Sequence, residues 1–151
     1  MKARITWIGE RNFVGESGTG HAVVLGASSG PGQAGLGPSP MELVLIGMGG
    51  CAAFDVVHIL EKGREAIEDV TAELEATRAE TDPKVFTKIH VHFVVTGRGL
   101  SRDKVGRAIQ LSAEKYCSAS AMIAKTAAIT HDFEVVETAP SRSAGATPRP
   151  A

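Results

Sequence analysis

One apolar segment constrains the fold of this chain more than any other feature of its sequence. Residues 41–60 are about long enough to cross a lipid bilayer, and most of their side chains are apolar. The segment also contains three glycines and three ionisable side chains that would be expensive in lipid: Gly47, Gly49 and Gly50, and Glu42, Asp55 and His58. We therefore expect a buried helix in a soluble core rather than a membrane span.

The flanking residues indicate where this helix begins and ends. Ser39 is a suitable N-cap, Pro40 fits the first helical position, and Glu42 stands where its carboxylate completes a capping box. Gly63 offers a C-cap after Lys62. Because apolar side chains occur in nearly every direction around the helix axis, the pattern predicts a helix surrounded by protein.

Strands and shorter helices are predicted on both sides of this helix, from alternating apolar residues and from apolar residues spaced by three and four. The expected order is an antiparallel meander over 3–25, a loop over 26–40, a hairpin of strands over 68–77 and 85–97, a helix over 102–116, a short apolar segment over 119–128 and a strand over 131–137. This order indicates an α+β fold with one domain over 1–137. Residues 138–151 are expected to form a disordered tail.

The charge balance and the cysteine count exclude several classes of protein. The chain has 16 Lys and Arg against 17 Asp and Glu, so its formal net charge of -1 gives no basic excess for nucleic acid. With 2 cysteines among 151 residues, it is not a disulfide-stapled scaffold. No apolar signal core follows Met1, and we expect a cytoplasmic protein with no nucleic-acid or membrane partner.

The two cysteines, Cys51 and Cys117, are the candidate reactive residues. Cys51 lies beside glycines that cost about 1 kcal/mol each in a helix interior, which suggests the close approach of another backbone or of a ligand. The alternative is that Cys51 is a small core residue at a tight helix crossing. Cys117 follows Lys115 and starts a new helix, so the helix N-terminus and the lysine are expected to lower the pKa of its thiol.

Two other groups of polar residues have ordinary structural explanations. Asp55 and His58 share a helical face with Cys51, but side chains stacked on one helix seldom reach a common substrate atom, so a catalytic triad is not expected. His90 and His92 share a strand face and could ligate zinc. That face is charged and should meet acidic residues of the preceding strand, so we expect a solvated surface and no metal site.

Together these residues resemble the OsmC/Ohr family, and in particular its YhfA-like branch. The resemblance covers about residues 1–137 and rests on three runs: Gly37-Pro38-Ser39-Pro40-Met41-Glu42-Leu43, Gly47-Met48-Gly49-Gly50-Cys51 and Lys115-Tyr116-Cys117-Ser118. It implies an OsmC-like α+β fold in which antiparallel sheets wrap around two central helices of an intertwined homodimer.

The resemblance also implies a chemistry. Cys51 would be the peroxidatic residue, whose thiolate attacks an organic hydroperoxide and becomes a sulfenic acid, and Cys117 would resolve that acid as a disulfide. The expected protein is a thiol-dependent peroxidase in oxidative stress defence. It would take hydrophobic peroxides, use an external dithiol as reductant and need no cofactor or metal.

Three positions depart from the active members of the family. Those members carry a Glu directly after the Pro, where this chain has Met41, with Glu42 one residue later. They also carry an Arg that holds the thiolate, for which Arg11 is the candidate, and a Pro after the second cysteine, where this chain has Ser118. A dimeric redox-sensing or ligand-binding protein without efficient turnover therefore stays open, as does a purely structural role of both cysteines in core packing.

Overall fold

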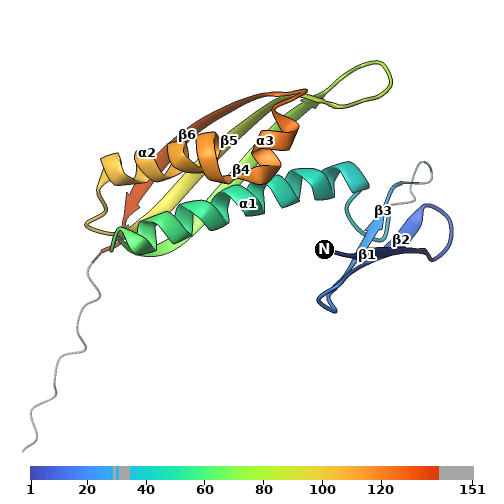
Figure 1. Cartoon of the computed structure of the whole chain (residues 1–151), viewed down its shortest axis with the longest axis horizontal. Helices are drawn as coiled ribbons and strands as arrows, with labels where there is room; N and C mark the ends of the chain where they lie inside the picture. The colour runs from blue at the N-terminus through green and yellow to red at the C-terminus, as the bar shows by residue number, and fades with distance from the viewer. Residues whose placement is uncertain (29, 31–34, 140–151) are drawn as a thin grey trace, which may run out of the picture. The chain divides into compact units, whose positions relative to one another are not determined.

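A computed structural model of the chain describes residues 1–28, 30 and 35–139. The chain divides into two compact units, Met1–Met48 and Gly49–Ala151, and the long helix α1 (Pro40–Lys62) contributes residues to both (Figure 1). Each unit has a three-stranded sheet of its own.

The first unit contains the antiparallel meander that the alternation of apolar residues predicts. β1 (Ala3–Trp7), β2 (Asn12–Ser17) and β3 (Ala22–Gly26) pair in chain order. In the turn between β1 and β2, Gly9 and Glu10 adopt positive φ angles of 110° and 48°. The sheet leaves several large apolar side chains exposed, namely Ile5, Trp7, Val23 and Val24.

Helix α1 begins with the predicted capping box. The Ser39 hydroxyl accepts the N–H of Glu42 at 3.3 Å, and the Glu42 carboxylate accepts the N–H of Ser39 at 2.7 Å. These bonds satisfy backbone donors that a helix leaves free at its start. The side-chain and backbone hydrogen bonds with Ser39 also lower the pKa of the Glu42 carboxyl.

Helix α1 ends in a Schellman motif whose left-handed residue is Arg64, with a φ of 59°. The N–H of Glu65 bonds to the Leu60 carbonyl oxygen and the N–H of Arg64 to that of Glu61, both at 3.0 Å. Gly63 follows the last helical residue, as predicted. The position that most favours glycine is one residue later, and this chain fills it with arginine.

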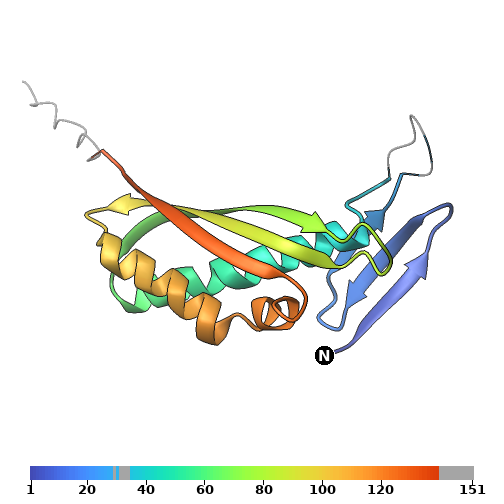
Figure 2. The same cartoon turned by 90° about the horizontal axis from the view of Figure 1, so that it is seen from above.

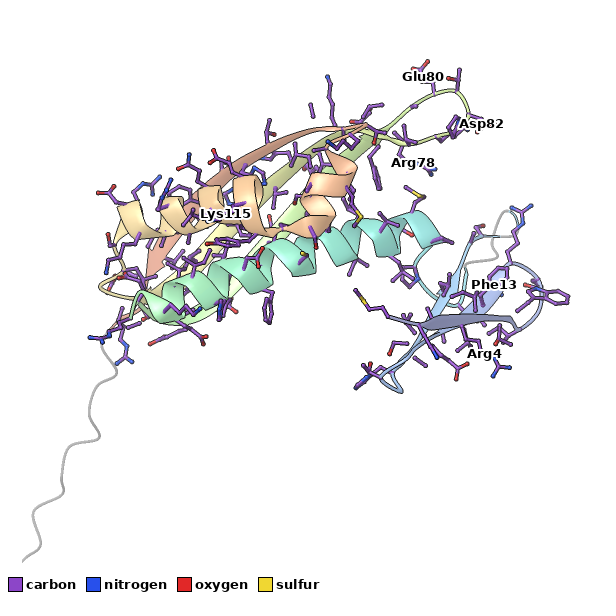
Figure 3. All side chains as sticks on the ribbon, viewed as in Figure 1. Arg4, Phe13, Arg78, Glu80, Asp82 and Lys115 are labelled. Carbon is purple, nitrogen blue, oxygen red and sulfur yellow. The ribbon has the colours of Figure 1, made fainter. Side chains whose placement is uncertain are left out.

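The second unit contains a mixed sheet. β4 (Ala66–Arg78) and β5 (Phe86–Arg98) form the predicted antiparallel hairpin. Arg78 ends β4, and Glu80 and Asp82 lie in the connecting loop (Figure 3). β6 (Ala128–Glu137) pairs with β5 in parallel, so the expectation of antiparallel sheets is wrong at this strand.

A helical crossover explains the parallel direction of β6. After β5 the chain passes through α2 (Arg102–Leu111), the π-helical turn η1 (Ser112–Tyr116) and α3 (Ser118–Ile123) before it enters β6. Parallel neighbours need a connection of this length, whereas a tight turn gives an antiparallel pair. The helix predicted over 102–116 is confirmed as α2 followed by η1.

The core of the second unit lies between one face of its sheet and the helices α1 and α2, which both cover that face (Figure 2). Alternate residues of β5 point into this core, and each helix adds a stripe spaced by three or four residues. The buried residues are Ile89, Val91, Phe93 and Val95 in β5, Ala52, Val56 and Leu60 in α1, and Val105, Ala108 and Ile109 in α2.

The predicted helix surrounded by protein stays a prediction, because the described part of one chain covers α1 only in part. Phe54 is 72% exposed and Ile46 is 58% exposed. Of the most apolar stretch of α1, only 28% is buried. By length and composition alone α1 could cross a membrane, a test that the core helices of soluble proteins also pass. The described residues thus leave an apolar face of α1 uncovered.

The face of the second sheet away from the helices is polar, as expected. The register pairs Glu73 with His92 and Glu75 with His90 across β4 and β5. From β6, Asp132 Oδ1 lies 2.6 Å from His92 Nδ1 and 3.2 Å from His90 Nε2. The two histidines therefore belong to a hydrogen-bonded surface cluster.

The single domain over 1–137 and the tail over 138–151 stay predictions. β6 ends at Glu137, and the N–H and hydroxyl of Thr138 both donate to the Gly97 carbonyl oxygen, at 2.9 Å and 3.1 Å. Residues 140–151 lie outside the described part of the chain.

Candidate functional site

Both cysteines meet in the second unit, together with one carboxylate. The sulfur atoms of Cys51 and Cys117 and a carboxylate oxygen of Asp55 all lie within 4.8 Å of one another. Cys51 and Asp55 stand about one turn apart on α1, and Cys117 lies between η1 and α3. Residues far apart in the sequence thus form one compact cluster.

A widened helical turn leads into Cys117. The N–H of Cys117 bonds to the Ser112 carbonyl oxygen at 2.9 Å, with the five-residue spacing of a π-helix. Cys117 then adopts an extended conformation, with φ of -69° and ψ of 98°, and caps the start of α3. The helix start predicted at this residue is confirmed.

Ser112 is a site residue that sequence reasoning missed. It is 1% exposed, and its hydroxyl lies 3.1 Å from Asp55 Oδ2 and 3.3 Å from the Ala52 carbonyl oxygen, both of which accept from it. The spacing of residues 102–116 places Ser112 in the apolar stripe of the helix. A polar residue at such a core position was the available signal, because buried hydroxyls need partners.

The pKa of the Cys117 thiol is raised, so the predicted lowering is wrong. Burial is the main cause, since it disfavours the thiolate, and the neighbouring Cys51 adds to it. Hydrogen bonds from the Ser120 hydroxyl, at 3.0 Å, and the Ser120 N–H, at 3.4 Å, act in the opposite direction. Lys115, labelled in Figure 3, places its ammonium group over the Tyr116 ring, 5.3 Å from the centroid.

Cys51 is partly exposed, whereas Cys117 is buried. A Cβ on Gly49 would lie 2.6 Å from Leu74 Cδ1 of β4, so packing within this unit explains that glycine. A Cβ on Gly50 would meet nothing within 4 Å in the described part of the chain. The surface of α1 at Gly50, next to Cys51 in the sequence, is therefore open in the described part of the chain.

Of the two polar residues that share a helical face with Cys51, only Asp55 joins the cluster. His58 is exposed and stacks on Phe54, with ring centroids 6.3 Å apart and an interplanar angle of 13°. The arrangement is therefore not a Cys, Asp and His triad. The Asp55 carboxylate instead offers a negative charge or a proton acceptor next to both thiols.

Among the positions that depart from the family's active members, Glu42 and Arg11 make local hydrogen bonds. Glu42 belongs to the capping box of α1, and Met41 beside it is partly exposed. Arg11 is exposed in the turn before β2, where its carbonyl oxygen accepts the N–H of Ala27 at 3.2 Å. Ser118 is exposed at the start of α3.

Known proteins have sequences related to most of this chain. Residues 30–132 match the family model described as OsmC-like protein. The chain is 48% identical over 136 residues to Protein YhfA of Escherichia coli (strain K12), and this alignment covers 90% of the chain and 98% of its relative.

Solved structures extend the likeness. A hypothetical protein from Aquifex aeolicus VF5 is 29% identical, with a TM-score of 0.80 over 91% of this chain and 97% of that one. An organic hydroperoxide resistance protein OsmC from Legionella pneumophila is 20% identical, with a TM-score of 0.63 over 91% and 98%, and shares the fold. The matching family model and the identity with YhfA show that the chain belongs to the OsmC/Ohr family, in its YhfA-like branch.

Proposed function

We propose that this protein is a thiol-dependent peroxidase that reduces organic hydroperoxides through Cys51 and Cys117, as part of oxidative stress defence. The observation that carries the proposal is the convergence of the two sulfur atoms within 4.8 Å, with Cys51 partly exposed and Cys117 buried. An accessible thiol paired with a protected one suits a peroxidatic residue and its resolving partner. The fold shared with the Legionella hydroperoxide resistance protein is consistent with this assignment.

The reaction proceeds in three balanced steps. The Cys51 thiolate attacks the distal peroxide oxygen, the O–O bond breaks, and the alcohol leaves with one proton while Cys51 becomes a sulfenic acid. The Cys117 thiolate then attacks the Cys51 sulfur, which forms the disulfide and releases water. An external dithiol reduces that disulfide and restores both thiols.

Neighbouring side chains have distinct parts in this scheme. The Ser120 hydroxyl and N–H donate to Cys117 Sγ, so they favour the thiolate that resolves the sulfenic acid. The Asp55 carboxylate, held by Ser112, is near enough to take up the proton of a thiol as the sulfur becomes nucleophilic.

The proposal includes a cytoplasmic homodimer that acts on hydrophobic peroxides. The uncovered apolar side chains of α1, among them Phe54, provide a surface that a second copy would bury. A cavity of about 630 Å³ lies among α2, α3 and β6, and Ser120 lines it while neither cysteine does. A second copy would therefore complete the substrate-binding surface next to Cys51.

The second candidate is a dimeric redox sensor or ligand-binding protein without efficient turnover. Two observations favour it, namely the engagement of Glu42 in the helix cap and the raised pKa of the Cys117 thiol. A slow resolving thiol suits a protein that records oxidation rather than one that removes peroxide rapidly.

Peroxide consumption separates the two candidates. The reduced protein is mixed with cumene hydroperoxide and a dithiol, and the loss of peroxide is followed over many turnovers. We expect catalytic loss with the wild type and none above background with Cys51→Ser. Without the dithiol, Cys117→Ser should consume one peroxide per chain and leave a sulfenic acid that dimedone traps. Disulfide formation without repeated turnover favours the sensor, and equal rates for the wild type and Cys51→Ser contradict the peroxidase.

A further inference from the structure

We propose that the reduced site binds one thiophilic divalent cation of the zinc class through Cys51 Sγ, Cys117 Sγ and the Asp55 carboxylate. This inference goes beyond the peroxidase proposal and stands independently of it, because metal binding needs the thiols in their reduced state and no peroxide. It also departs from the expectation of no metal site.

The three donor atoms supply three of the four ligands of a tetrahedral zinc centre and lie near the spacing that such a centre needs. Two sulfurs bound to one tetrahedral zinc at about 2.3 Å lie about 3.8 Å apart. The three donor atoms already lie within 4.8 Å of one another, so contraction by about 1 Å joins them on one ion. Cys51 is partly exposed, which leaves access for a water molecule as fourth ligand.

The charges at the site also favour a cation. Two thiols and a carboxylate converge, and among the described residues no ion pair with lysine or arginine involves Asp55. A divalent ion displaces both thiol protons, forms two metal–sulfur bonds, and removes the repulsion between neighbouring anions. The positive charge of the ion thereby stabilises the Cys117 thiolate, which burial alone disfavours.

Hydrogen bonds around the donors orient them for this role. Ser112 donates to Asp55 Oδ2 at 3.1 Å, and the Ser120 hydroxyl donates to Cys117 Sγ at 3.0 Å. Partners of this kind fix the orientation of metal ligands in known sites. Sulfur donors select zinc and other thiophilic ions over magnesium and calcium, which prefer oxygen.

The histidine pair on the outer face of the sheet is a poorer candidate. Among residues 1–28, 30 and 35–139, Cys51, Asp55 and Cys117 form the one group of three donor residues placed so that it could hold a metal ion. His90 and His92 instead share hydrogen bonds with Asp132, and His90 Nδ1 also bonds to Thr130. A variant of His92 therefore serves as the control for binding at the surface.

Titration with Co²⁺ under anaerobic conditions tests the proposal. The full-length chain is reduced, stripped of metal and titrated while absorption is recorded. We expect one Co²⁺ per chain, with tetrahedral d–d bands and sulfur-to-metal charge transfer, and displacement by Zn²⁺. Cys51→Ser and Cys117→Ser should each weaken binding by about 100-fold and Asp55→Asn by about 10-fold, whereas His92→Ala should have no effect.

A second measurement guards against loss of folding in the variants. Zn²⁺ should raise the Tm of the reduced wild type. It should not change the Tm of wild-type protein in which diamide has joined the two cysteines, and these two samples have the same sequence. Absence of stoichiometric binding to the reduced wild type would overturn the proposal. So would binding that survives both cysteine substitutions or disappears in His92→Ala.

Discussion

The Ser112 hydroxyl donates a hydrogen bond to Asp55 Oδ2 at 3.1 Å and links the end of α2 to α1 beside both cysteines. Ser112 also supplies the carbonyl oxygen that accepts the N–H of Cys117. One residue thus fixes the Asp55 side chain and the backbone that leads into Cys117. We therefore expect Ser112 to help set the distance between the two sulfurs, although it is neither a thiol nor a charged group.

Removal of this hydroxyl should loosen the site. We expect Ser112→Ala to lower the free energy of unfolding by about 1 to 2 kcal/mol, because Asp55 loses a partly buried hydrogen-bond partner. Disulfide formation between Cys51 and Cys117 should also slow. Urea denaturation and the rate of thiol loss with diamide measure the two effects. The exposed Ser118→Ala is the matched control, and equal behaviour of the two variants would refute this role.

Ser120 should tune the resolving thiol. Its hydroxyl donates to Cys117 Sγ at 3.0 Å and lowers the pKa of that thiol against the larger effect of burial. Ser120→Ala should therefore raise this pKa further and slow disulfide formation at neutral pH. The pH dependence of Cys117 alkylation, measured on a Cys51→Ser background, reports the shift. A profile that is unchanged or moves to lower pH would contradict the assigned role.

Much of the fold follows from local sequence signals. The capping box at Ser39 and Glu42 involves residues three apart, and alternation over residues 85–97 suffices to identify β5 and its buried face. Alternation is the same in parallel and antiparallel strands, so it could not reveal that β6 runs parallel to β5. The sequence pattern also could not predict which face of α1 stays uncovered, because a helix that is apolar on all sides does not show which elements cover each side.

In the candidate site too, local sequence signals predict some features and the tertiary structure decides the others. Helical spacing puts Asp55 beside Cys51, but the approach of Cys117 is a tertiary contact that neither residue type nor spacing predicts. The pKa of Cys117 was mispredicted because a helix start and a nearby lysine are local, whereas burial arises from the whole fold. Ser112 was missed because an isolated serine in an apolar stripe acquires its role only when Asp55 lies opposite.

Two histidines of the second unit, His92 and His131, should have pKa values shifted in opposite directions. The hydrogen bond to Asp132 raises the pKa of His92, helped by the charges of Asp132, Glu134 and Glu73, while burial lowers that of His131. NMR titration of the imidazole signals should place His92 above about 6.5 and His131 below it. Asp132→Asn should return His92 towards its ordinary value and leave His131 low.

The raised pKa of His92 also determines how the stability of the folded protein changes with pH. Protonated His92 binds Asp132 in the folded state, so its contribution is complete below about pH 6.5 and is lost as the pH rises through the raised pKa. Asp132→Asn should therefore lower the urea midpoint more at about pH 6 than at about pH 9. A larger loss at the higher pH would contradict this account.

The end of α1 offers a stabilising substitution. Arg64 holds a φ of 59°, a conformation that costs a side-chain-bearing residue about 1 to 2 kcal/mol. Arg64→Gly should raise the free energy of unfolding by about 0.5 to 1 kcal/mol after the entropic cost of glycine is deducted. Arg64→Ala, which keeps the strain, is the control. Equal unfolding midpoints for the glycine and alanine variants would show that this φ angle is not strained.

The central claim is that Cys51 and Cys117 act as one redox couple, and peptide mass mapping tests it most directly. The reduced protein is treated with one equivalent of cumene hydroperoxide without added reductant, alkylated and digested. The account predicts a disulfide between Cys51 and Cys117 of the same chain, formed as the peroxide is consumed. Two cysteines that are both alkylated while the peroxide remains, or a disulfide that joins Cys51 residues of two chains, would contradict it.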